Sequence, residues 1–225
     1  MTETDIIKQA YKNRIKNLEN SIGGFVINIV LKKNSVKYLK HNYYYHQNGH
    51  TWDLIDHTEQ NWPLCYAIFF SASSKSEEYA ESMTILSYMR YGEVKQWEST
   101  FNTVSSEEDR GEAYDAFKKR KAEKLISLVE ERFPGLSNCI KSYYTATPLS
   151  YRDYIGNDDG SMYGIVKDYR NPLKTFISPR TKLPNLFLTG QNLNLHGILG
   201  ATMSGLVTCI AFTGSESIIE KVRNA

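Results

Sequence analysis

Residues 185–205, reading NLFLTGQNLNLHGILGATMSG, constrain the fold more than any other stretch of this chain. A short apolar run at 186–188 ends at a threonine and a glycine, and a polar loop follows up to residue 196. An apolar segment then extends from 197 to about 212. This order predicts a strand, a glycine turn and a buried helix.

Small residues recur on one side of the predicted helix. Gly200 and Ser204 are four residues apart, as are Ala201 and Gly205, so each pair shares a helix face. A face without large side chains lets a flat ligand approach the backbone. The unpaired N–H groups near 198–201, at the positive end of the helix dipole, would suit an electron-rich ligand edge.

Together with the preceding residues 143–180, this stretch resembles the C-terminal end of a family of FAD-dependent oxidoreductases. The family is grouped with phytoene desaturase, carotenoid isomerase and retinol saturase, within the flavin amine oxidoreductase superfamily. The matching pieces are TATPLSYRDYIGNDDGSMYGI, SPRTKLPNLFLTGQ and NLHGILGATMSG, in that order. The match is densest over the last third of the chain and thinner back to Gly23.

The resemblance implies that FAD is the cofactor. Backbone groups at the start of the helix would lie against the N1 and C2 carbonyl edge of the flavin, where reduction accumulates negative charge. A glycine before the loop would let the chain pass close to the cofactor. Gln191 stands where related flavoproteins often carry an acidic residue. The cofactor-binding residues implied are Gly190, Gln191, Gly197, Ile198, Leu199 and Gly200.

Four further residues are implied near the flavin or the substrate. Gly160, Ser161 and Tyr163 belong to a turn similar to the glycine-serine turn of the family. His196 precedes the helix, where a hydrogen bond at the helix entry is the alternative role. For any single glycine, a tight turn or helix packing is the alternative. No residue is identified as a general base, so the catalytic residues are unassigned.

The dinucleotide-binding motif of this family is missing from the chain. GxGxxG occurs nowhere in the sequence. We therefore expect an incomplete oxidoreductase that is inactive alone, with an N-terminal FAD-binding half on a separate chain as a partner and an apolar small molecule as the substrate. A fragment, a truncated gene product and a split subunit all stay open. The alternative function is a non-catalytic, vestigial protein that binds an apolar ligand.

The rest of the chain predicts an α+β fold. Aromatic-rich strands with intervening helices suggest a partial substrate-binding-type domain with an antiparallel or mixed sheet at 1–147. The C-terminal part of an FAD-binding, Rossmann-like domain would follow at 148–225. The predicted helices are 4–17, 105–133 and 215–222, and the predicted strands are 25–31, 43–46, 51–54, 66–70, 83–91 and 139–147.

Three local patterns refine this expectation. The Asn48-Gly49 pair between two short strands predicts a hairpin. The polar segment 71–82 suggests a surface loop. Ser105 and Glu108 form a capping-box pattern at the start of the long helix, whose inner stripe would be Tyr114, Phe117, Leu125, Leu128, Val129 and Phe133.

The charged residues indicate no nucleic-acid partner. The net charge is +2, from 27 basic and 25 acidic residues. The basic run 118–121 is predicted to be a solvated helix face. The histidines at 41, 46, 50 and 57 match no metal-ligand spacing and are predicted to be surface hairpin residues. The aspartates at 153, 158 and 159 are predicted to be turn residues.

The sequence predicts a cytoplasmic location. The charged N-terminus contains no signal-peptide core. The three cysteines, at 65, 139 and 209, form no CxxC pair, which suits a reducing compartment. Residues 197–214 are marginal in length for a membrane span, so a buried helix is favoured, and peripheral contact with a membrane stays open.

Overall fold

The computed structural model describes residues 4–47, 53–214 and 217–224. The chain forms two compact units: a sheet unit, residues 22–162, and a terminal unit, residues 1–21 together with 163–225. The fold is mixed α+β, as the sequence predicts. The unit boundary follows Met162, so residues 148–162 belong structurally to the sheet unit. The functional identities of the two predicted domains remain predictions.

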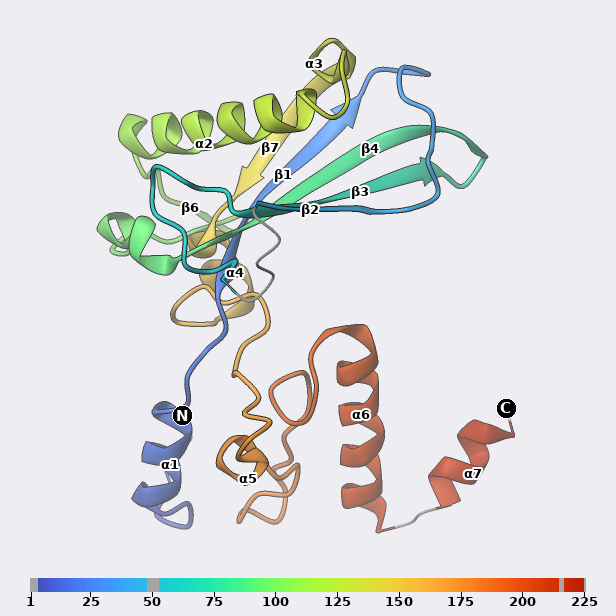
Figure 1. The fold of residues 1–225 in the computed structure, drawn as a ribbon. Helices are drawn as coiled ribbons and strands as arrows, with labels where there is room; N and C mark the ends of the chain where they lie inside the picture. The colour runs from blue at the N-terminus through green and yellow to red at the C-terminus, as the bar shows by residue number, and fades with distance from the viewer. Residues whose placement is uncertain (1–3, 48–52, 215–216, 225) are drawn as a thin grey trace. The chain divides into compact units, whose positions relative to one another are not determined.

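The sheet unit is built on a five-stranded antiparallel sheet in the order β2-β3-β4-β1-β7 (Figure 1). Its strands are β1 (Gly23–Leu31), β2 (Tyr43–His46), β3 (Cys65–Ser73), β4 (Ser76–Met89) and β7 (Ile140–Ala146). A small separate hairpin joins β5 (Asn102–Thr103) and β6 (Ser106–Glu107). Short helices η1 (Tyr91–Glu93), η2 (Lys95–Trp97), α3 (Leu136–Cys139) and α4 (Pro148–Ile155) complete the unit.

Strand β1 is central because β4 pairs with one of its edges and β7 with the other. Residues 23–27 are buried in succession, as expected for a strand covered on both faces. Beyond them the side chains alternate, and Asn28 and Val30 are exposed. The prediction of a strand buried on both faces is therefore correct only for its first half.

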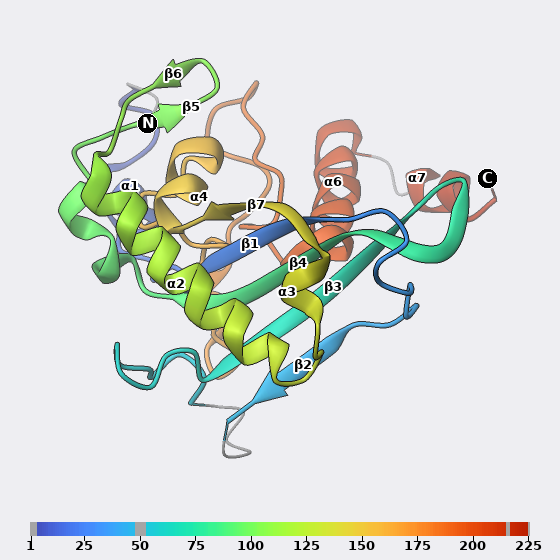
Figure 2. The ribbon, with the colours of Figure 1, turned by 90° about the horizontal axis from the view of Figure 1, so that it is seen from above.

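Helix α2 (Glu112–Glu130) covers one face of the sheet (Figure 1, Figure 2). The predicted inner stripe is confirmed: four of its members are buried, and Leu128 and Phe133 pack partly buried against the same core. Burying each such side chain contributes roughly 1.5–3 kcal/mol. The predicted capping box is wrong, since the helix starts after Gly111 and the segment before it forms the β5–β6 hairpin.

Strand pairing differs from the predictions in two places. Strand β2 pairs with β3, in a register that places Tyr43 opposite Ile68, and residues 53–54, the described part of its predicted partner, form no strand. The Asn48-Gly49 turn lies outside the described residues. The polar segment 71–82 continues the β3–β4 hairpin, with Ser71 opposite Ser82, so its polarity reflects solvent exposure and not a loss of pairing.

Two residues predicted to lie on the surface are buried. Lys121 is 4% exposed, and His57 is 3% exposed. Both contact the carboxylate of Glu93, which provides the countercharge that the buried Lys121 ammonium requires. Of the other histidines, those at 41 and 46 are exposed, as predicted, and residue 50 is outside the described ranges.

Asp153 is not a turn residue. It lies in α4 and is buried, and its carboxylate accepts hydrogen bonds from Arg110, Arg152 and the backbone N–H of Asn102. The carboxylate that suggested a turn instead takes part in this ion-pair network. Asp158 does lie in a turn, where it is exposed.

The terminal unit has a small core. Ile165, Ile177 and Leu193 are buried, with side chains of α1 (Gln9–Lys16) and nearby segments packed against them. Its other helices are α5 (Pro172–Thr175), α6 (Gly197–Thr213) and α7 (Ser217–Arg223). Helix α1 is shorter than the predicted 4–17. Within the described ranges, no helix combines the length and apolar character that crossing a bilayer requires.

The three cysteines are free thiols. Cys65 is buried, Cys139 is partly buried and Cys209 is exposed. Burial raises the pKa of the Cys65 thiol above its ordinary value. This thiol therefore stays protonated and unreactive at neutral pH.

Candidate functional site

Helix α6 begins at an open, uncharged N-terminus. Its N-cap residue, His196, makes no side-chain capping bond, and the first turn holds no acidic residue. Ile198 is 90% exposed and Leu199 is 71% exposed. The first N–H groups of a helix have no intrahelical partner and lie at the positive end of its dipole. The tip is therefore accessible to electron-rich atoms of a ligand.

One of the two small-residue faces of α6 is closed. Gly200 and Ser204 are the buried residues of this helix, and a side chain on Gly200 would overlap with the backbone carbonyl of Leu195. The expectation that a ligand approaches this face is wrong, because the chain itself occupies it. The other face is open: Ala201 is exposed, and no atom of the described residues lies near the missing side chain of Gly205.

The prediction of a buried helix is also wrong for α6. The described part of the chain covers only one side of it, and several large apolar residues remain exposed. These residues are Ile198, Leu199, Met203 and Phe212. Helix α6 lacks a charged residue, so no charged face lies opposite these exposed side chains.

The segment that holds α6 is irregular rather than a strand. Residues 186–188 form only an isolated bridge between Arg180 and Phe187. The Phe187 ring packs edge-to-face on Phe212 with a centroid distance of 5.3 Å. The Thr208 hydroxyl donates a hydrogen bond of 2.9 Å to the carbonyl of Leu188. These contacts anchor one side of the helix in place of the predicted strand.

Two predicted site residues are brought together at the entrance to α6. The rings of Tyr163 and His196 are stacked, with centroids 5.7 Å apart and planes at 17°. The His196 Nε2 lies 2.8 Å from the carbonyl oxygen of Ile165. Because a carbonyl only accepts, Nε2 carries the hydrogen, and in the neutral ring Nδ1 keeps the lone pair. The alternative role of His196, a hydrogen bond at the helix entry, is thus present.

Asn192 is a residue of this site that sequence reasoning missed. Its side-chain oxygen accepts a 2.9 Å hydrogen bond from the backbone N–H of Ile165. Gly164 has a φ of +68°, and a side chain there would overlap with the Asn192 amide. The Lys167 ammonium donates to the carbonyls of Asn192 and Leu193, and burial lowers the pKa of Lys167. Nothing in the sequence distinguishes Asn192 from its neighbours in the polar loop.

The predicted glycine turn before this loop is present. Gly190 has a φ of +102°, which favours glycine, and within the described ranges no atom lies near its missing side chain. Its carbonyl accepts a hydrogen bond from the N–H of Leu193, which closes the turn. Gln191 follows, partly buried. The backbone at Gly190 is therefore open on one side.

Gly160 and Ser161 lie in the sheet unit. Gly160 has a φ of +60°, and a side chain there would overlap with the carbonyl of Pro148. Ser161 is fully buried, its hydroxyl has no partner among the described residues, and its carbonyl accepts a hydrogen bond from the Asn157 amide. Gly160 is therefore needed for close packing against Pro148, which is the alternative role predicted from the sequence for a single glycine.

Comparisons with known proteins agree with the motifs. No protein-family model matches the chain. The all-trans-retinol 13,14-reductase of Danio rerio is 26% identical over 148 residues, covering 62% of this chain and 23% of the relative. That of Homo sapiens is 25% identical over 169 residues, covering 72% of this chain and 27% of the relative. That of Macaca fascicularis is 26% identical over 152 residues, covering 64% of this chain and 24% of the relative.

The chain spans about a quarter of the length of these curated relatives. All of them carry the same name, and the alignments extend over most of the chain. The chain is thus a distant relative of the all-trans-retinol 13,14-reductases.

Proposed function

We propose that this chain is the C-terminal half of a flavin-dependent oxidoreductase. Its substrate would be a polyene, carotenoid or retinoid-like molecule that is desaturated, saturated or isomerised by hydride transfer with FAD. The observation that carries this proposal is the exposed, uncharged first turn of α6, where Ile198 and Leu199 are exposed and the first N–H groups have no intrahelical partner. No carboxylate in that turn repels an electron-rich flavin edge, so the residues present fit the cofactor.

In this function the chain positions and stabilises rather than reacts. Bound FAD supplies a hydride donor or acceptor. The N–H groups of Gly197, Ile198 and Leu199, which have no intrahelical partner, would stabilise negative charge on the adjacent ring edge. The positive φ of Gly190 allows a close approach of the backbone. The His196 ring, held on the Ile165 carbonyl, would keep the helix entry rigid.

The exposed apolar surface of α6 supports a protein partner. A helix that is apolar all round is typically buried. Covering Ile198, Leu199 or Phe212 would stabilise a complex by roughly 1.5–3 kcal/mol for each side chain fully buried. We propose that a polypeptide segment carrying GxGxxG, the FAD-binding half, covers this surface. Pyrophosphate contacts of about 1 kcal/mol or more each are missing without it, so the chain alone should bind FAD weakly.

Co-expression tests the proposal. The chain is produced alone and with a GxGxxG-containing FAD-binding segment of a family member, and bound flavin is measured by its visible absorbance after purification. We expect colourless protein alone and yellow protein from the complex. Ile198→Lys should reduce both complex formation and flavin content. Val104→Lys, a matched change at an exposed apolar residue of the sheet unit, should alter neither.

Folded protein that stays colourless with each such segment would overturn the proposal. It would favour the second candidate, a non-catalytic protein that binds an apolar ligand. A cavity of about 330 Å³ in the terminal unit supports this candidate, because Ile7, Tyr11, Ile15, Ile177 and Leu188 are among the residues that line it. Saturable quenching of protein fluorescence by retinol, weakened by Ile177→Lys, would then be the expected result.

A further inference from the structure

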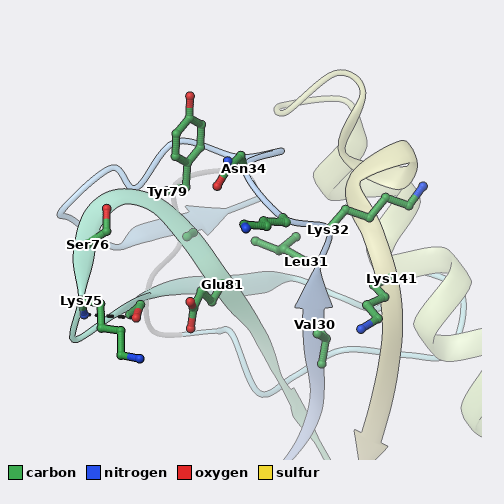
Figure 3. Close-up of a pocket in the computed structure, with 12 residues that line it drawn as sticks. Val30, Leu31, Lys32, Asn34, Lys75, Ser76, Tyr79, Glu81 and Lys141 are labelled. Atoms are coloured by element: carbon green, nitrogen blue, oxygen red, sulfur yellow. Dashed lines mark hydrogen bonds between the residues drawn. The ribbon is translucent and has the colours of Figure 1, made fainter.

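A second cavity, of about 490 Å³, lies at the far end of the sheet from the predicted domain junction, where β1 ends and the β3–β4 hairpin turns (Figure 3). We call it the lysine cavity. Its charged lining residues come from four segments of the sheet unit: Lys32 and Lys33 after β1, Lys75 in the hairpin turn, Glu81 on β4 and Lys141 on β7. Asn34, Ser76 and Tyr79 add neutral hydrogen-bonding groups.

Two irregularities in the sheet place charged residues at this cavity. On β7, Ser142 pairs with Val30 and Ile140 pairs with Leu31, so Lys141 is an extra residue without a pairing position. On β4, Glu81 is extra in the same way, because Ser82 and Ala80 pair with consecutive residues of β3. A bulge re-aims the side chain of the extra residue, and bulges are concentrated near functional sites. Both extra residues line the lysine cavity.

The lining carries a concentrated positive charge. Four lysines and one glutamate give a formal charge of +3, which exceeds the +2 of the whole chain. The excess is therefore local and not a reflection of the overall composition. Like charges held around one cavity repel one another, and a bound anion relieves that repulsion.

Three of these ammonium groups are unengaged. Lys32 donates a 2.7 Å hydrogen bond to the carbonyl of Asn138. Within the described part of the chain, the ammonium groups of Lys33, Lys75 and Lys141 have neither an ion pair nor a hydrogen bond. Nine donor hydrogens thus face solvent around the cavity, three on each ammonium. Lysine binds phosphate as a point charge without the fixed geometry that arginine needs.

We propose that the lysine cavity binds a phosphate group of an organic phosphate ester. Lys75 and Lys141 lie on different sides of the cavity (Figure 3), and the flexible side chains of these two lysines and of Lys33 would bring their ammonium groups to the phosphate oxygens. When ionised, the Glu81 carboxylate accepts hydrogen bonds and cannot donate them. It therefore repels a second anionic group and accepts a hydrogen bond from a hydroxyl next to the phosphate. The site is separate from α6 and does not depend on the proposed flavin chemistry.

Binding of inorganic phosphate to the full chain tests this site. Apparent dissociation constants are measured by amide chemical-shift titration at neutral pH, with chloride keeping the ionic strength constant. Lys33→Gln, Lys75→Gln and Lys141→Gln should each weaken binding roughly fivefold, the effect of losing one charge at close range in water. Glu81→Gln should tighten binding by a similar factor. Lys95→Gln, at an exposed lysine outside the cavity, is the matched control.

The signs of these changes decide the outcome. Equal affinity in all variants, or the same loss in Lys95→Gln as in Lys141→Gln, would overturn the proposal, since bulk charge alone would then explain binding. A second arm uses phosphatidylcholine vesicles with and without phosphatidic acid. Selective binding to the acidic vesicles, lost in Lys141→Gln, would assign the phosphate to a lipid headgroup. Binding of soluble phosphate without vesicle selectivity would assign it to a soluble ester.

Discussion

The Nε2 atom of His57 lies 2.8 Å from one carboxylate oxygen of Glu93, and the Nζ atom of Lys121 lies 2.7 Å from the other. The Lys121 ammonium also lies over the Trp62 ring, 4.4 Å from its centroid. Burial by itself would raise the pKa of Glu93, but the hydrogen bonds from His57 and Lys121 and the lysine charge lower it to about 2. This carboxylate connects α2 to the segment after β4.

Acid should weaken the sheet unit through Glu93. Its pKa is about 2 in the folded protein and 4.5 in the unfolded chain, so the unfolded chain binds the proton first as the pH falls. The stabilisation is complete above the unfolded pKa and is lost as the pH falls through 4.5 towards 2. We expect a loss on the order of 2 kcal/mol in the free energy of unfolding, allowing for solvent screening. Urea denaturation at a series of acidic pH values measures it.

Glu93→Gln should flatten this pH dependence and should destabilise the protein at neutral pH, because Lys121 is left buried without a countercharge. Glu123→Gln, on the exposed side of α2, should preserve the slope of the parent protein. If the free energy of unfolding of Glu93→Gln depended on pH as steeply as that of the parent protein, Glu93 would not be the group responsible for the acid destabilisation.

Asp153→Asn should be strongly destabilising. It removes the charge that neutralises Arg110 and Arg152, both largely buried beside α4. Breaking one partner of a buried ion pair costs roughly 3–5 kcal/mol. Thermal and urea unfolding measure the loss. Asp158→Asn, five residues along the chain in an exposed turn, should change stability by less than about 0.5 kcal/mol.

Gly160→Ala and Gly156→Ala separate two costs of replacing a glycine. Both residues have a positive φ, +60° and +83°, but only at Gly160 would the new side chain overlap with the Pro148 carbonyl. We expect about 1 kcal/mol of destabilisation at Gly156, from the backbone conformation alone. The loss at Gly160 should exceed it by about 2 kcal/mol or more. Equal losses would show that the Pro148 contact is absent in solution.

Gly200→Ala and Gly205→Ala should change stability in opposite directions. Both are interior residues of α6, where alanine is favoured over glycine by roughly 1 kcal/mol. At Gly205 no atom obstructs the added methyl group, so α6 should become more stable. At Gly200 the methyl group would overlap with the Leu195 carbonyl, so the variant should be destabilised. Hydrogen exchange of the α6 amides provides the local measurement, and stabilisation by both changes would contradict the closed face.

The sequence alone determined the elements whose signal is local. The periodic apolar residues of α2 identified its buried stripe, because a helix can bury only one side against a sheet. The β-branched and aromatic runs located most of the strands. Ordered glycine motifs near the C-terminus indicated the distant relationship, since such turns depend on backbone conformations that few residues adopt. The motifs for α6 also located the open tip that carries the proposed function.

Tertiary structure decided what depends on distant neighbours. The pairing of β2 with β3, the burial of His57 and Lys121, and the engagement of Asp153 each need a partner far away in the chain. No local pattern encodes a partner 28 or 43 residues distant, as Glu93 is from Lys121 and Arg110 from Asp153. The sheet bulges at Lys141 and Glu81 likewise arise from pairing register. Sequence periodicity reports which residues can be buried, but only packing decides which partners surround them and which apolar faces, such as that of α6, stay uncovered.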